Sequence, residues 1–298
     1  MIRDVKIPPL FSLIDKGKNL LLLKEEYKDL LLRLGIEDVE AFVRRNQVGA
    51  RSLHGRTAHP SIPLKEGERV VVRRYVHGGL LRFFTRDLYC LGARSFRELS
   101  LTEEIRACGI PTIQAIGAIH RCLWFPFYRA YFLSLEHPSA IDMTEYLQRV
   151  GPSSSGQTLS RKRTAIRAAG VLIRRFHDAG FFHRDLQLKN MLVTSDHVLL
   201  IDFDRSYRAT HLSMRERMTN LLRLNRSVEK WKRRRLPITR TDRWRFFLAY
   251  AGDDQAIRQA LRRSLRFHWV GTFFHRVYWT MGRSWFKGTQ KRSNLTGF

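Results

Sequence analysis

Three polar side chains between positions 185 and 202 have the types and the spacing that phosphoryl transfer requires. Asp185 lies in the run Phe-His-Arg-Asp-Leu-Gln-Leu-Lys-Asn, Asn190 ends this run, and Asp202 follows twelve residues later. One carboxylate can orient an attacking hydroxyl group and accept its proton. A second carboxylate and an amide oxygen can hold Mg²⁺ ions that bridge nucleotide phosphates. The set predicts a kinase-type site that uses ATP and Mg²⁺; the alternative is three polar residues at unrelated loop ends.

The elements around these residues are expected to bring them together. Two short apolar runs, residues 190–194 and 197–203, flank a Ser-Asp turn and predict a hairpin. A loop that carries Asp185 leads into the first run, and Asp202 lies near the end of the second. Such a hairpin can place all three polar side chains at one edge.

The rest of the chain reads as a strand-rich part followed by a helix-rich part. We expect strands at 69–75 and 128–135, and helices at 95–108 and 158–179. The leucine-rich run Leu20–Leu34 has polar residues at helical spacing and predicts that residues 1–45 form a helical extension. The predicted fold class is α+β with two lobes. The predicted units are the extension 1–45, an N-lobe at 46–138 and a C-lobe at 139–298.

Composition limits the compartment and the partners. The 54 Lys and Arg residues outnumber 27 Asp and Glu, which indicates an anionic partner such as a nucleic acid, an acidic membrane surface or a phosphorylated substrate. The three cysteines have no Cys-x-x-Cys spacing, so a reduced cytosolic setting is the simpler interpretation. We expect neither a secretory signal nor a membrane-spanning segment, because the longest apolar-rich stretch, 122–135, is short and interrupted.

The catalytic segment resembles that of the protein-kinase-like superfamily. More narrowly, His177-Asp-Ala-Gly-Phe-Phe-His-Arg-Asp185 and Ile201-Asp-Phe-Asp-Arg205 resemble the bacterial lipopolysaccharide core kinases, the family of 3-deoxy-D-manno-octulosonic acid (Kdo) kinase. The run Val71–Leu80, the segment Phe96–Leu99 and the run Asn220–Asn225 resemble further parts of that family. The resemblance covers roughly residues 69–252. It implies a two-lobed protein-kinase-like fold with a small β-rich N-lobe and a larger helical C-lobe.

The resemblance also implies residue roles. Asp185 would be the catalytic base, and Asn190 and Asp202 the Mg²⁺ ligands. Glu98 would be the glutamate of the helix that pairs with a basic strand residue, and Arg73 stands where most protein kinases have lysine. A guanidinium can bridge phosphate and carboxylate groups. Alternatively, Arg73 is a solvated strand residue and Glu98 a helix-surface charge.

Other departures from protein kinases bear on the acceptor. Gln187 stands two residues after the catalytic Asp, where Ser/Thr protein kinases have lysine, while Lys189 either neutralises the transferred phosphate or is solvated. His183 is expected to be a scaffold of the loop, and Asp204 either supports the metal site or caps a turn. No Ala-Pro-Glu motif follows, which favours a small or lipid-linked acceptor over a protein.

The last third of the chain is expected to meet that acceptor. Residues 205–298 hold 23 Lys and Arg against 5 Asp and Glu, and basic residues alternate there with aromatic ones. Such segments favour anionic membrane surfaces; the alternatives are a solvated basic face and nucleic acid, for which no module is recognisable. We expect an ATP-dependent kinase that phosphorylates a Kdo or heptose hydroxyl of the lipid A–core glycolipid. It would lie in the cytoplasm, on the inner face of the inner membrane. The alternatives are a protein or other small-molecule kinase, and a catalytically inactive kinase-like module that binds membranes or nucleic acid.

Overall fold

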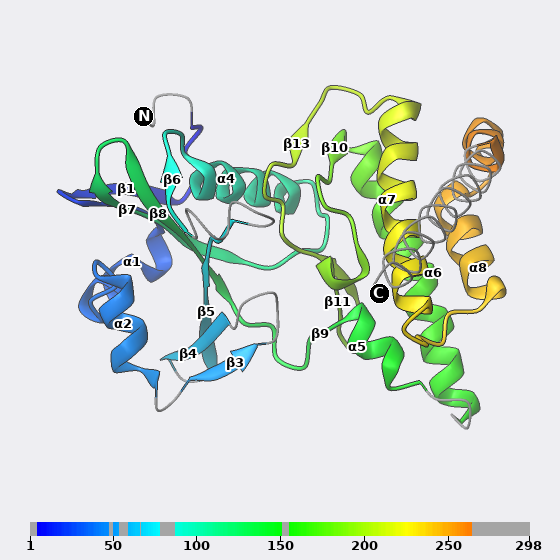
Figure 1. The fold of residues 1–298 in the computed structure, drawn as a ribbon, viewed down its shortest axis with the longest axis horizontal. Helices are drawn as coiled ribbons and strands as arrows, with labels where there is room; N and C mark the ends of the chain where they lie inside the picture. Colours follow the sequence, from blue (N-terminus) through cyan, green and yellow to red (C-terminus); the bar gives the residue numbers. More distant parts are fainter. Residues whose placement is uncertain are drawn as a thin grey trace, which may run out of the picture.

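The chain folds into a strand-rich half and a helical half, which Figure 1 shows side by side. This α+β, two-lobed architecture confirms the predicted fold class. The structure, a computed structural model, describes residues 5–47, 50–53, 59–65, 67–77, 87–150 and 155–263.

The first half is built on one antiparallel sheet. Its strands are β1 (Phe11–Lys16), β2 (Asn19–Lys24), β3 (Arg51–Leu53), β4 (His59–Lys65), β5 (Glu68–Arg74), β6 (Tyr89–Cys90), β7 (Ala115–Trp124) and β8 (Phe127–Leu135). Their order in space is β1-β2-β7-β8-β5-β4-β3, and β6 pairs with β8. The helices of this half are α1 (Glu25–Arg33), α2 (Val39–Arg45) and α4 (Arg94–Ala107).

Helices cover both faces of this sheet. In β2, Leu21 and Leu23 pack in a cluster with α1 and α2, which includes Tyr27. Leu22 points to the opposite face and packs in a second cluster with Phe96 of α4. Successive side chains of a strand point to opposite faces, so a strand buried on both sides carries an unbroken apolar run. Helix α4 therefore packs on one face of the sheet, where its Glu98 can contact Arg73 of β5.

The prediction of a helical extension at residues 1–45 is wrong for residues 11–24. These residues form β1 and β2, and β2 pairs with β7 in the register Leu21↔Ile119, so they belong to the main sheet. The helical interpretation failed because the run Leu20–Leu23 is apolar at every position, which suits a helix and a doubly buried strand equally well. Only α1 and α2 match the expected helix. The boundary between residues 138 and 139 stays a prediction.

The second half is helical with small sheets. Its elements are β9 (Ile141–Asp142), α5 (Met143–Gln148), α6 (Gly156–Asp178), β10 (Phe181–Phe182), the 3₁₀ helix η2 (Leu188–Asn190), β11 (Met191–Val193), β12 (Val198–Leu200), β13 (Tyr207–Arg208), α7 (Met214–Lys232) and α8 (Arg240–Ala251). Residues 255–263 are also helical. The core centres on α6, whose Ile173 and Phe176 have no exposed surface.

Several predicted elements are confirmed. The strands expected at 69–75 and 128–135 are β5 and β8, and the helices expected at 95–108 and 158–179 are α4 and α6. The predicted hairpin is β11 and β12, which pair antiparallel from Met191↔Leu200 to Val193↔Val198.

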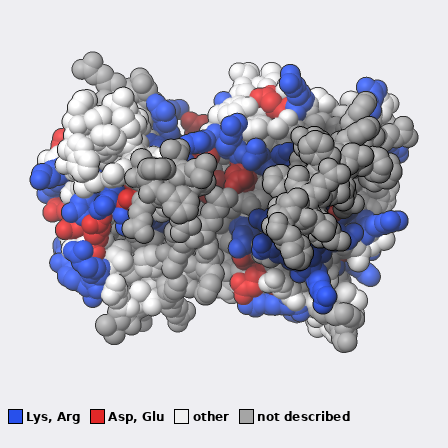
Figure 2. All heavy atoms as spheres, in the orientation of Figure 1, with Lys and Arg blue, Asp and Glu red and all other residues white. Residues whose placement is uncertain are grey.

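The basic character of the chain is visible on its surface. Figure 2 shows blue Lys and Arg side chains on both halves, with a small acidic patch between them. Residues 264–298, which include part of the predicted basic aromatic surface, lie outside the described residues, as do residues 78–80 of the run Val71–Leu80. None of the helices in the described ranges is both long and apolar enough to cross a bilayer.

Candidate active site

The loop that carries Asp185 is organised by His183, which is fully buried. Its ring Nδ1 accepts a hydrogen bond from the backbone N–H of Asp185 at 3.1 Å, and Nε2 lies 3.1 Å from the carbonyl oxygen of Ile201. The ring is therefore neutral, with its proton on Nε2. Burial lowers the pKa of His183, which supports this state. His183 is the scaffold that the sequence predicts, because both ring nitrogens are used to hold the backbone.

Helix α7 holds the same loop from the other side. The side chain of Asn220 accepts a hydrogen bond from the His183 N–H and donates one to the His183 carbonyl, each at 3.0 Å. Two turns further along α7, the hydroxyl of Ser227 accepts a hydrogen bond from the N–H of Leu188 at 3.3 Å. These contacts explain why the run Asn220–Asn225 accompanies the catalytic segment: this helix fixes the loop that presents Asp185.

The carboxylate of Asp185 is accessible, with 40% of its side chain exposed. Its Oδ2 accepts a hydrogen bond from the amide of Gln187 at 2.8 Å, and its Oδ1 lies 3.6 Å from Nη1 of Arg223. A base must reach its substrate while its own position is fixed. The Gln187 contact and the hydrogen bond from the backbone N–H of Asp185 to the His183 ring fix Asp185, and its exposure leaves the carboxylate within reach of a hydroxyl group.

Asn190 and Asp202 are joined through the backbone of the hairpin. The Asn190 amide nitrogen donates to the carbonyl oxygen of Asp185 at 2.9 Å, and the N–H of Ile201 donates to the carbonyl of Asn190 at 3.0 Å. The Asn190 amide can thus offer its oxygen as a ligand atom. Asp202 has a φ angle of +66°, a left-handed conformation that Asp tolerates better than most residues. The structure brings Asp185, Asn190 and Asp202 to one site, as the sequence predicts.

Arg73 of β5 joins the predicted residues from the two halves. Its Nη2 lies 2.5 Å from Oε1 of Glu98, and its Nη1 lies 2.5 Å from Oδ1 of Asp202. Glu98 is buried in α4 and also accepts a hydrogen bond from the hydroxyl of Tyr75. Burial raises the pKa of Glu98 to about 7, and the Arg73 guanidinium opposes the rise. Arg73 and Glu98 are therefore partners, and neither is a solvated surface charge.

Sequence reasoning missed Tyr75 and Arg94. Tyr75 follows Arg73 by two residues, so the alternation of a strand could have placed it on the same face. Arg94, at the start of α4, forms a two-point ion pair with Asp204, and one of its contacts, from Nε to Oδ1, measures 2.5 Å. No sequence pattern connects residues 94 and 204. Asp204 thus anchors the loop that carries Asp202 to α4. Its expected support of a metal site stays a prediction.

Lys189 lies on the outer side of the catalytic loop. It is exposed, and its Nζ lies 5.4 Å from the ring centre of Trp231 in α7, a distance typical of a cation–π contact. Its expected role at the transferred phosphate stays a prediction.

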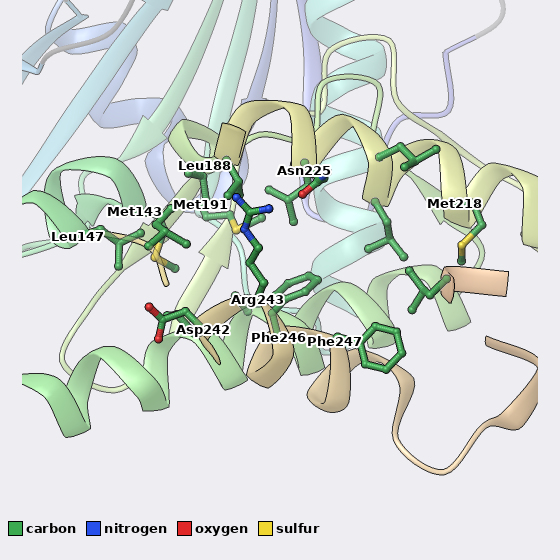
Figure 3. Close-up of a pocket in the computed structure, with 18 residues that line it drawn as sticks. Met143, Leu147, Leu188, Met191, Met218, Asn225, Asp242, Arg243, Phe246 and Phe247 are labelled. Atoms are coloured by element: carbon green, nitrogen blue, oxygen red, sulfur yellow. The ribbon is translucent and has the colours of Figure 1, made fainter. Parts of the chain in front are cut away.

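Two hollows adjoin the site. One, of about 440 Å³, lies beside the start of α4 and is lined by Glu98, Phe203 and Arg205, among others. The other, of about 240 Å³, is apolar and lies between α5, α7 and α8. Figure 3 shows Leu188 and Met191, the neighbours of the Asn190 loop, at its rim and Arg243 reaching into it from α8. Leu188 and Met191 therefore connect the Asn190 loop to this apolar hollow.

The donor set fits Mg²⁺ rather than a metal held by the protein alone. Within the described ranges, no cluster of three or more His, Cys, Asp or Glu side chains could hold a metal ion. Mg²⁺ in phosphoryl-transfer sites is usually held by one or two protein oxygens, with nucleotide phosphates and water completing the shell. One carboxylate, Asp202, and one amide oxygen, Asn190, match that pattern.

A strand-rich lobe with a basic residue paired to a helix glutamate, joined to a helical lobe with this Asp–Asn–Asp set, defines a kinase-like phosphotransferase. The family model described as "Lipopolysaccharide kinase (Kdo/WaaP) family" matches residues 42–250. The chain belongs to this family, and it is a kinase that transfers phosphate to an alcohol group.

Known proteins agree with this assignment. The chain is 33% identical over 172 residues to the 3-deoxy-D-manno-octulosonic acid kinase of Pasteurella multocida (strain Pm70), covering 55% of this chain and 67% of that protein. It is 31% identical over 191 residues to the protein of the same name from Photobacterium damsela subsp. piscicida, covering 61% and 74%. A solved structure, "WaaP in complex with acyl carrier protein", matches with a TM-score of 0.52 and 19% identity, covering 83% of this chain and 98% of that one. This last likeness supports the fold.

Proposed function

We propose that this kinase transfers the γ-phosphoryl group of ATP to a sugar hydroxyl, of Kdo or heptose, in the inner core of lipopolysaccharide. The observation that carries the proposal is the position of Asp185: a fixed yet accessible carboxylate beside the Asn190–Asp202 hairpin. The relatives that bear the name Kdo kinase support the choice of acceptor.

In the proposed reaction, Asp185 orients the acceptor hydroxyl and receives its proton. A bond forms between the acceptor oxygen and the γ-phosphorus, and the bond from that phosphorus to the β,γ-bridging oxygen breaks, so that its electron pair leaves with ADP. The amide of Gln187 holds Oδ2 of Asp185 in place at 2.8 Å during this step. The proton and the charge are thereby balanced between acceptor, Asp185 and ADP.

Asn190 and Asp202 would hold Mg²⁺, which neutralises the charge on the nucleotide phosphates when it is bound. Arg73 would bind a nucleotide phosphate, because Glu98 holds its guanidinium at the boundary of the two lobes. A guanidinium can contact a carboxylate and a phosphate together through its separate N–H donors. Its contact with Asp202 places it next to the proposed metal site.

The setting proposed for the reaction is the cytoplasmic face of the inner membrane, with the enzyme bound peripherally. The acceptor, a lipid A–Kdo core glycolipid, is anionic and membrane-embedded, and residues 205–298 carry a large excess of basic over acidic residues. Charge complementarity therefore favours binding of the enzyme to the surface that presents its acceptor.

The test is transfer of labelled phosphate from Mg·ATP to two purified acceptors, lipid A–Kdo and a heptosylated core, with a generic protein acceptor as a third arm. We expect label in one glycolipid, lost in the absence of Mg²⁺. Label in the protein alone would contradict the proposed acceptor class and favour a protein kinase. Binding of Mg·ATP without transfer to any acceptor would contradict the proposed acceptors as well.

A further inference from the structure

Arg223, on α7, lies beside the proposed base, Asp185. Its Nη1 is 3.6 Å from Oδ1 of Asp185, which makes an ion pair too long for a hydrogen bond. About a third of the Arg223 side chain is exposed, at 35%, and so is a similar share of the Asp185 side chain. An accessible ion pair of this kind contributes little to stability. Stability therefore does not explain why Arg223 lies next to Asp185, and its position points to a functional role.

The backbone of Arg223 is placed firmly against the catalytic loop. One turn before it, Asn220 makes two hydrogen bonds with the backbone of His183, and one turn after it, Ser227 accepts one from Leu188. Residues three, four and seven apart lie on one face of a helix. Arg223 thus belongs to the face of α7 that follows the catalytic loop, and this face directs it toward Asp185.

The guanidinium of Arg223 has N–H groups that make no hydrogen bond among the described residues, unlike those of the other arginines of the site. Arg73 contacts Glu98, Asp202 and Tyr75, and Arg94 is bound at two points by Asp204. Among the described residues, no hydrogen bond from Arg223 is found, and its Nε is buried without a partner. An arginine held only by a long ion pair can turn its remaining N–H groups toward an anion.

The position two residues after Asp185, where Ser/Thr protein kinases have lysine, is occupied by the uncharged Gln187, which bonds to Asp185 itself. In phosphoryl transfer the moving group carries negative charge spread over its three equatorial oxygens, next to the base and the acceptor oxygen. A cation within 4 Å of the base is close to that place. We propose that Arg223 contacts the transferring phosphoryl group and supplies, from α7, the positive charge that position 187 lacks.

This inference rests on the proposed function and adds a catalytic residue to it. Arg223 stabilises the charge on the phosphoryl group while Asp185 takes the proton of the acceptor. Donors directed at a developing charge act on the transition state more than on the bound substrate, so the loss falls on kcat. Affinity for Mg·ATP, which Arg73 and Asp202 determine, is expected to change little.

The test compares Arg223→Gln, Arg223→Lys and a matched control, Arg215→Gln, which removes an exposed charge two turns away on the same helix. Transfer from labelled ATP to lipid A–Kdo gives kcat and the two KM values, and urea unfolding checks the fold. For Arg223→Gln we expect a loss of kcat of about 100-fold or more, by analogy with the loss of one oxyanion donor. The KM for ATP should stay within about threefold, Arg223→Lys should recover at least about tenfold, and Arg215→Gln should match the wild type.

A kcat within about threefold of the wild type in Arg223→Gln would overturn the inference, and so would a change confined to the KM of the acceptor. Should Arg223→Gln fail to fold, Arg223→Lys decides, because a point charge in place of the guanidinium still predicts about a tenfold loss of kcat. If the wild type transfers phosphate neither to lipid A–Kdo nor to the heptosylated core, the proposed function fails separately. The slow transfer from ATP to water then gives the same comparison, with a loss of at least about tenfold in Arg223→Gln expected and an unchanged rate contradictory.

Discussion

The guanidinium of Arg94, in the first turn of α4, forms a two-point ion pair with the carboxylate of Asp204, two residues beyond Asp202. A second ionic connection runs from Glu98 of the same helix through Arg73 to Asp202. Helix α4 is therefore attached to the proposed metal-binding loop at two separate points. A change that displaces α4 should therefore also displace Asp202.

This relationship predicts a strong coupling between Arg94 and Asp204. Arg94→Gln and Asp204→Asn should each lower kcat/KM for Mg·ATP about tenfold, because either change loosens the loop that carries Asp202. The double variant should be little worse than the less active single variant, with a coupling energy of about 1–1.4 kcal/mol, close to the free energy of one tenfold loss. Steady-state kinetics of the four proteins supplies the cycle. Arg97→Gln, an exposed neighbour on α4, is the control, and additive losses would contradict the coupling.

His120 of β7 predicts a pH dependence of stability. Its ring stacks between Phe96 and Tyr128, with centroid distances of 4.0 and 4.4 Å, and burial lowers the pKa of His120 to about 3. The unfolded chain, with a pKa near 6.5, takes up a proton as the pH falls below that value, whereas the folded chain does not until about pH 3. The free energy of unfolding should therefore fall as the pH drops below 6.5, by about 1.4 kcal/mol at pH 5.5 for this one group.

The variant His120→Phe isolates this contribution, since phenylalanine can keep the stacking and cannot be protonated. Urea unfolding at pH 7.5 and pH 5.5 should show a pH effect smaller by about 1.4 kcal/mol in the variant than in the wild type. The buried His177, whose pKa burial also lowers to about 3, remains in both proteins and cancels from the comparison. Equal pH effects in the two proteins would rule out a neutral, buried His120.

Gly170 lies where α6 packs closely against α8, and a side chain at this position should not fit. A Cβ atom at this position would lie 2.8 Å from the carbonyl oxygen of Phe246 and 2.9 Å from Cβ of Ala249. Gly170→Ala should lower the free energy of unfolding by about 1–3 kcal/mol, because one helix would have to move. Gly156→Ala, in the first turn of the same helix with no described atom within 4 Å, is the control and should be neutral or stabilising by less than about 1 kcal/mol. Equal midpoints for both variants in urea would show that the two helices can separate at no cost.

The sequence predicts the arrangement of the candidate site residues well because their relation is local. Asp185, Asn190 and Asp202 lie within eighteen residues, and a short hairpin is enough to bring them together. The pairing of Arg73 with Glu98 depends on the family resemblance, which supplied the partners that spacing alone could not. In the structure Arg73 contacts Glu98, and Asn190 contacts the backbone of Asp185, as expected.

Other features could not be predicted from one sequence. Strand β2 is apolar on both faces, so its pattern lacks the alternation that distinguishes a strand from a helix. Arg94 and Asp204 are separated by 110 positions, and Arg223 meets Asp185 only because α7 packs along the catalytic loop. Such contacts depend on tertiary packing, for which a local pattern contains no signal.

Asp185 is the proposed base of the phosphoryl transfer, whereas Arg73 and Asp202 are the residues proposed to bind Mg·ATP. The most direct test is to measure turnover with lipid A–Kdo and Mg·ATP binding in Asp185→Asn, a change that keeps size and removes the charge. Turnover is expected to fall by at least about 100-fold while Mg·ATP binding stays within about threefold. Near-normal turnover in Asp185→Asn would contradict the role of Asp185 as the base.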